Sequence, residues 1–126
     1  MSAAVKYKSQ KNILLVDDNR LNIRYFSDIL AFMGHNVIAV SNPDDVLPKV
    51  KEYSPDLIIM DFDLKHMVDG IDLINSLRLD KSFCTPIIGS SSDVYNKVDI
   101  FYGLCNLAIP KPLTINKVQE AVSKFC

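Results

Sequence analysis

Five short apolar runs recur along the chain at intervals of about 20 to 30 residues. Strands with one face in water alternate between apolar and polar residues, whereas continuous apolar runs are typical of strands buried on both faces of a parallel sheet. The runs cover residues 13–16, 37–40, 57–60, 86–89 and 107–109. We therefore predict five parallel strands, and parallel neighbours require a crossover segment between them.

The segments between the runs carry apolar residues at helical spacing. These residues are Leu21, Tyr25, Ile29 and Met33; Ile71, Ile74 and Leu77; Val94, Val98 and Phe101; and Ile115, Val118, Val122 and Phe125. Together with a weaker helix expected over 44–53, strands and helices alternate, with five of each. This order predicts an α/β three-layer sandwich, in which helices cover both faces of one parallel sheet.

Three local signals predict where helices begin and end. Pro48 lacks an N–H group and would clash inside a helix, so we expect the helix in 44–53 to start late, with Pro48 in its first turn. Gly34 is placed to end the first helix, and Thr114 to cap the start of the last one.

Length and composition indicate one domain without a membrane or nucleic-acid partner. A chain of 126 residues can bury a full core, and a net charge of -1 argues against a broad nucleic-acid-binding face. No apolar stretch approaches the roughly 18 residues that a membrane helix needs. We predict a polar arm over 1–11, without the apolar region of a signal peptide, and a single domain over 12–126.

The cysteines and histidines do not form a recognisable metal or disulfide pattern. Cys84, Cys105 and Cys126 are odd in number, widely spaced and without a CxxC pair, which favours a reduced, cytoplasmic setting. His35 and His66 are too isolated to predict a metal cluster.

Charged residues follow three of the predicted strands. Asp17 and Asp18 end the first run, Asp61 ends the third, and Lys111 follows the last. The carboxyl ends of parallel strands share one edge, so these groups should meet there. Two carboxylates about 4 Å apart repel by roughly 1 to 4 kcal/mol. We therefore expect a cation between them, and an oxygen-only ligand set suits Mg²⁺.

These residues fall into an order and spacing that resembles a known family. The segments concerned are Val16-Asp17-Asp18-Asn19, Met60-Asp61, Pro86-Ile87-Ile88-Gly89-Ser90-Ser91 and Lys111-Pro112. They resemble the receiver domain of two-component response regulators over nearly the whole chain, from about 11 to 125. The pair Asn19 and Asn22 resembles the pattern of a subset of receiver domains, which is found in hybrid kinases and in stand-alone regulators of the cell-cycle type.

The resemblance implies a flavodoxin-like strand order of 2-1-3-4-5 and a phosphorylation site at the switch point of the sheet. Asp61 would accept a phosphoryl group from a phosphohistidine of a sensor histidine kinase or histidine phosphotransfer protein. The Mg²⁺ ligands would be Asp61, Asp18 directly, Asp17 through water, and the backbone carbonyl of Asp63. Ser91 and Lys111 would contact the phosphoryl oxygens.

The implied function is phosphorelay signal transduction by a switch that catalyses only its own phosphorylation and dephosphorylation. A downstream target protein would bind the face formed by the fourth helix, the last strand and the last helix. Two departures from the family pattern affect how phosphorylation would change this binding face. The loop after Asp61 is one residue longer than usual, with Lys65 where receivers have proline. Ala108 also replaces the aromatic residue of the last strand, so we expect weaker coupling between site and surface.

Two other functions fit part of the pattern. Asp61-Phe62-Asp63 is a DxD motif, as in haloacid-dehalogenase-type phosphatases, but those enzymes place it on their first strand and need a later acidic pair. A pseudo-receiver that binds proteins without phosphorylation is the other alternative, which Ala108 and the altered loop favour and the complete acidic set opposes.

Overall fold

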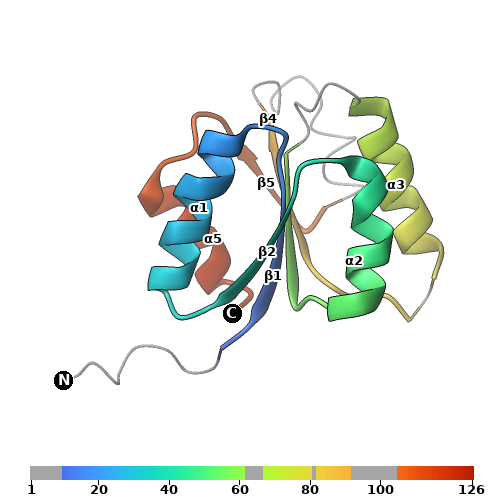
Figure 1. Ribbon diagram of the computed structural model, residues 1–126, viewed down its shortest axis with the longest axis horizontal. Helices are drawn as coiled ribbons and strands as arrows, with labels where there is room; N and C mark the ends of the chain where they lie inside the picture. Colours follow the sequence, from blue (N-terminus) through green and yellow to red (C-terminus); the bar gives the residue numbers. More distant parts are fainter. Residues whose placement is uncertain (1–9, 62–66, 81, 92–104) are drawn as a thin grey trace.

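A computed structural model describes residues 10–61, 67–80, 82–91 and 105–126 of the protein. Its centre is a parallel five-stranded sheet in the order β2-β1-β3-β4-β5, as predicted (Figure 1). The strands are β1 (Asn12–Val16), β2 (Asn36–Val40), β3 (Leu57–Asp61), β4 (Ile87–Ser91) and β5 (Leu107–Pro110). The flavodoxin-like fold class predicted from the sequence is confirmed.

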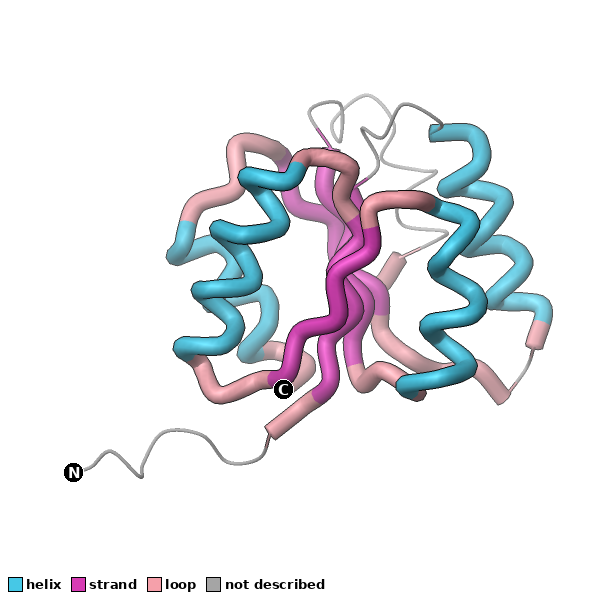
Figure 2. The backbone as a smooth tube through the Cα atoms, viewed as in Figure 1, coloured by secondary structure: helices cyan, strands magenta, loops and turns pink. Residues whose placement is uncertain are grey.

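Helices cover both faces of the sheet. They are α1 (Arg20–Phe32), the 3-10 turn η1 (Pro43–Asp45), α2 (Val46–Tyr53), α3 (Met67–Leu79) and α5 (Ile115–Ser123). α1 and α5 lie on one face, and α2 and α3 on the other (Figures 1 and 2). The helix predicted around Val94, the loop with His66, and Asp63 lie outside the described residues.

Two separate core layers explain why the strands read as continuous apolar runs. In β1, Ile13 and Leu15 pack in the layer under α1 and α5, while Leu14 and Val16 pack in the layer under α2 and α3. All four side chains are at most 2% exposed. Burying each of these side chains contributes about 1.5 to 3 kcal/mol. Both faces of β1 contribute in this way because β1 lies inside the sheet and helices cover both of its faces.

The local signals act as predicted. Pro48 is the third residue of α2, in its first turn, because η1 precedes the helix. Gly34 follows α1 with a φ of 94°, a left-handed value that glycine adopts at no steric cost. The Thr114 side chain accepts a hydrogen bond of 3.2 Å from the N–H of Lys117, and so caps α5.

The last strand lies at the edge of the sheet. β5 is an edge strand, where Pro110 needs no ladder donor on its outer side. Cys84, Cys105 and Cys126 are free thiols. Within the described ranges, none of the helices has the length and apolar character needed to cross a membrane.

Candidate functional site

The first two acidic residues lie in the turn between β1 and α1. Asp17 continues β1 by one hydrogen bond, which its N–H donates to the Val40 carbonyl at 3.1 Å. The chain then enters α1, which Asn19 caps. Because successive side chains alternate at the end of a strand, Asp17 turns inward and is only 4% exposed, whereas Asp18 faces solvent.

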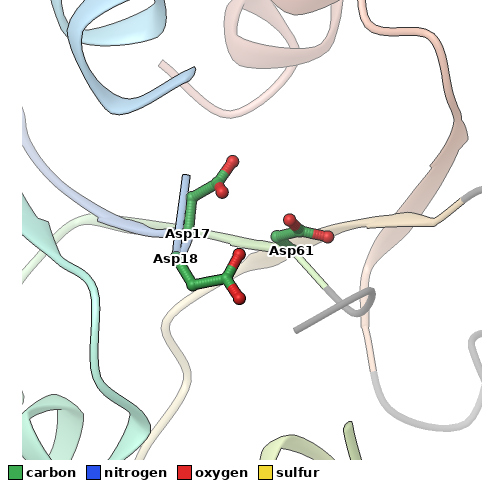
Figure 3. Close-up of side chains that lie close together, drawn as sticks. All are labelled: Asp17, Asp18 and Asp61. Carbon is green, nitrogen blue, oxygen red and sulfur yellow. The ribbon is translucent and has the colours of Figure 1, made fainter. Parts of the chain in front are cut away.

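Asp61 is the last residue of β3 and meets these two carboxylates at the same edge. Its side chain is buried, with 5% of the residue exposed. Asp17, Asp18 and Asp61 each offer an oxygen atom, and these atoms lie within 4.8 Å of one another (Figure 3). The structure therefore brings together the three carboxylates that the sequence places at strand ends.

Lys111 reaches the same point from the end of β5. Its Nζ lies 2.9 Å from Oδ1 of Asp61, and its side chain is 26% exposed. The backbone fixes this approach, because the N–H of Lys111 donates to the Ser91 carbonyl at 3.0 Å. The Lys111–Pro112 peptide bond is cis. An ammonium group thus neutralises one of the three carboxylates.

Ser90 and Ser91 both end β4 next to Asp61, and alternation separates them. Ser90 pairs with Asp61 in the ladder, and its residue lines a small apolar cavity under α5 together with Ile59 and Val118. Ser91 is fully buried and pairs with Pro110 of β5. Its side chain lies on the opposite face of the strand from that of Ser90.

Crowding at this edge changes the acidity of Asp17. Burial raises the pKa of the Asp17 carboxyl to about 6, and the nearby charge of Asp61 acts in the same direction. Hydrogen bonds from the Asn19 N–H and the Asn22 side chain, together with the charge of Lys111, lower this pKa and only partly compensate. The carboxylate is therefore ionised at neutral pH against an electrostatic cost that a bound cation would relieve.

A cleft of about 500 Å³ opens beside the carboxylates, between α1 and the loop after β5. It is lined by Asp17, Asn22, Tyr25, Phe26, Lys111, Pro112 and Leu113. From the sequence, Asn22 was recognisable only as a family feature, and neither Tyr25 nor Leu113 was predicted to line the site. Asn22 lies five residues after Asp17, across the turn into α1, and that spacing is the signal that could have linked them.

The donor set fits Mg²⁺. All three side chains offer carboxylate oxygens, which this hard cation prefers. Mg–O bonds of about 2.1 Å place two ligands of one ion at most about 4.2 Å apart. The three carboxylate oxygens lie within 4.8 Å of one another, which is the range expected for ligands that share one ion directly or through water.

The fold and this edge together define a flavodoxin-like α/β domain with an acidic site at the carboxyl ends of its strands. The family model of the response regulator receiver domain matches residues 13–123, and the chain belongs to that family. It is a receiver domain of the two-component type, which serves phosphorelay signalling as a switch rather than as a classical enzyme.

Curated relatives and solved structures agree with this assignment. The polar-differentiation response regulator DivK of Brucella anthropi is 28% identical over 118 residues, covering 91% of this chain and 95% of the relative. DivK of Brucella abortus strain S19 is 27% identical with the same coverage.

Two solved structures share the fold. Chemotaxis protein CheY4 of Vibrio cholerae has a TM-score of 0.83 at 19% identity, with 94% of this chain and all of that chain covered. The receiver domain of sensor histidine kinase PA1611 from Pseudomonas aeruginosa has a TM-score of 0.80 at 22% identity, covering 93% and 98%. Its structure has a magnesium ion coordinated in the active site cleft.

Proposed function

We propose that this protein is a Mg²⁺-dependent phosphoacceptor switch in which Asp61 receives a phosphoryl group from a partner phosphohistidine. The observation that carries this proposal is the position of Asp61, 2.9 Å from the Lys111 ammonium and beside Asp17 and Asp18. A nucleophilic carboxylate needs cationic groups around it, because the incoming phosphoryl group is itself negative. The pseudo-receiver alternative has no use for such an arrangement.

Asp17, Asp18 and Asp61 would hold the metal, with the backbone carbonyl of Asp63 as a further ligand. The magnesium ion in the PA1611 receiver supports this assignment, as does the all-oxygen donor set. When bound, the ion would neutralise negative charge on the phosphoryl oxygens.

The remaining residues position the reaction. An Asp61 carboxylate oxygen forms the new P–O bond while the P–N bond of the donor breaks and returns its electron pair to the imidazole. Lys111 neutralises the phosphoryl charge, and the Ser91 hydroxyl donates to a phosphoryl oxygen. Both act by electrostatics and position, since phosphoryl transfer needs little other help from a protein.

A sensor histidine kinase or a histidine phosphotransfer protein would supply the phosphoryl group through the cleft. The cleft borders both Asp17 and Lys111, and α1 presents apolar surface beside it. Leu21 is 79% exposed and Tyr25 45% exposed, so both side chains offer apolar surface to a partner. A partner helix or loop could cover both residues while its histidine approaches Asp61.

The output would be a changed affinity of the surface around β5 and α5 for a downstream protein. In β5, Ala108 packs, partly buried, against the core layer under α2 and α3. It has no ring whose position could report the state of Ser91, so the change in affinity is expected to be smaller than in receivers with an aromatic residue there.

Phosphorylation by a small donor tests the proposal. The protein is incubated with acetyl phosphate and Mg²⁺, and its intact mass is measured. We expect one added phosphoryl group in the wild type and none in Asp61→Asn. Asp72→Asn removes an exposed carboxylate from α3 and serves as the matched control, which should label like the wild type. Equal labelling of Asp61→Asn and the wild type would contradict the assignment.

A further inference from the structure

β2 forms one edge of the sheet, and alternate residues of this strand point their backbone groups away from the sheet. The N–H of Asn36 donates to the Lys11 carbonyl at 2.8 Å, so Asn36 faces β1. In a parallel ladder, alternate residues direct both N–H and C=O to the same neighbour. Val37 and Ala39 therefore direct theirs outward, where no hydrogen bond from the described part of the chain reaches them.

β2 lacks the features that usually protect an edge strand from pairing with another chain. Such strands carry charged residues or proline, contain a bulge, or are covered by another element. β2 reads Asn-Val-Ile-Ala-Val, and all five residues pair with β1 in an unbroken register. Figure 1 shows β2 nearest the viewer, between α1 and α2, with no described helix or strand in front of it. The opposite edge, β5, ends in Pro110, which has no N–H to offer a further strand.

We propose that β2 pairs in antiparallel orientation with β2 of a second copy of this chain, so that two sheets join into one continuous sheet. The strand is self-complementary, because its outward residues Val37 and Ala39 lie symmetrically on either side of Ile38. A two-fold axis at Ile38 places Val37 opposite the partner's Ala39, and each such pair exchanges both N–H···O=C bonds. This inference goes beyond the proposed function and does not depend on it.

The side chains along β2 suit this pairing. Ile38 is only partly buried against the core layer under α2 and α3, and across the two-fold axis it would lie against its own counterpart. β-branched side chains form favourable cross-strand pairs, and here the pair would remove apolar surface from water. Ala39 is exposed and small, so the partner's backbone can approach to ladder distance without a clash.

Charges at the two ends of β2 favour a second copy in antiparallel orientation as the occupant of this edge. Asp44 and Asp45, both exposed, follow the end of the strand, whereas Lys11 lies beside its start. Antiparallel pairing brings the acidic end of one copy next to the basic end of the other at both ends of the interface. Such complementary charges steer two molecules together and suppress other orientations.

The test measures the oligomeric state of the full chain by sedimentation equilibrium, up to about 1 mM protein. We expect the average mass of the wild type to rise with concentration from that of one chain toward that of two. Ala39→Lys adds a charge that each copy would bring into the interface, and it should raise the dissociation constant of the dimer at least about tenfold. Ala39→Pro removes an outward N–H and should weaken the dimer too. Ser76→Lys adds the same charge at an exposed position of α3, and this matched control should dimerise like the wild type.

Amide hydrogen exchange of the wild type at low and high concentration is a second readout that needs no variant. The N–H groups of Val37 and Ala39 should exchange more slowly as the protein dimerises. A wild type that stays monomeric throughout overturns the proposal, and if this monomer binds an extended peptide instead, the edge serves a foreign strand. A dimer that Ala39→Lys leaves intact, or that leaves exchange at Val37 and Ala39 unchanged, uses another surface and also overturns it.

Discussion

Asp17→Asn should make the metal-free protein more stable at neutral pH, although it removes part of the site. The carboxyl of Asp17 has a pKa of about 6 in the folded protein, against an ordinary value of 3.8. A group whose pKa rises on folding binds its proton more tightly in the folded state. It therefore contributes stability below pH 3.8, and this contribution is lost as the pH rises through 6.

The size of the effect follows from the two pKa values. Between pH 4 and pH 7 the linkage relation gives a loss of up to about 2.4 kcal/mol for one such group. Solvent near the cleft screens part of this cost, so we expect about 1 to 2 kcal/mol. Asparagine has nearly the same shape, keeps an oxygen that accepts from the Asn19 N–H, and carries no charge at either pH.

The assay is urea unfolding of wild type and Asp17→Asn in EDTA from pH 4 to pH 7. The free energy of unfolding of the variant, minus that of the wild type, should increase with pH by the stated amount. Asp28→Asn, which removes a carboxylate from the exposed side of α1, controls for the loss of one negative charge. A difference for Asp17→Asn that is flat across this range would refute the reasoning.

Magnesium should reduce this difference in stability. A cation between the carboxylates favours ionised Asp17, so Mg²⁺ should raise the free energy of unfolding of the wild type more than that of the variant. At a tenfold excess over the dissociation constant the gain is about 1.4 kcal/mol. For a domain of this size, that corresponds to a rise in Tm of about 5 °C.

Three further outcomes are expected. In urea titrations without metal, Lys111→Met should lower the free energy of unfolding by about 1 to 3 kcal/mol, because it leaves the buried Asp61 carboxylate without its ammonium partner. An unchanged free energy of unfolding would show that this ion pair adds no net stability. Thr114→Ala should lower the free energy of unfolding by about 0.5 to 2 kcal/mol through loss of the α5 cap, whereas Thr114→Ser should keep the cap and most of this stability. Equal losses in both variants would show that the methyl group of Thr114, and not its hydroxyl, provides the stability. Amide chemical shifts with and without a beryllofluoride phosphoryl mimic should change more at Ser91 than from Leu107 to Ile109, and the opposite pattern would show that Ala108 does not limit switching.

The fold could be predicted from the sequence because each strand contains a run of apolar residues. The strand order was implied by the family resemblance. The residues at which strands begin and end were harder to predict from the sequence. Asn12, Asn36 and Asp61 belong to strands through pairing with neighbours, which no local property of a polar residue reveals. The site was predicted as a set of strand-end charges. Alternation puts Asp17 and Asp18 on opposite sides, but which of the two is buried could be learned only from the structure.

The register of β5 places Lys111 and the expected readout position, Ala108, on opposite sides of the strand. Ile109 packs under α1 and α5, on the same side of β5 as the next alternate residue, Lys111. Ala108 packs on the other side, and its neighbour in the β4–β5 ladder is Gly89. Phosphorylation can shift an equilibrium only through contacts that differ between two states, and these two small residues offer few such contacts. The site can therefore retain its full chemistry while the β5 part of the surface responds weakly, which means that labelling and partner affinity have to be measured separately.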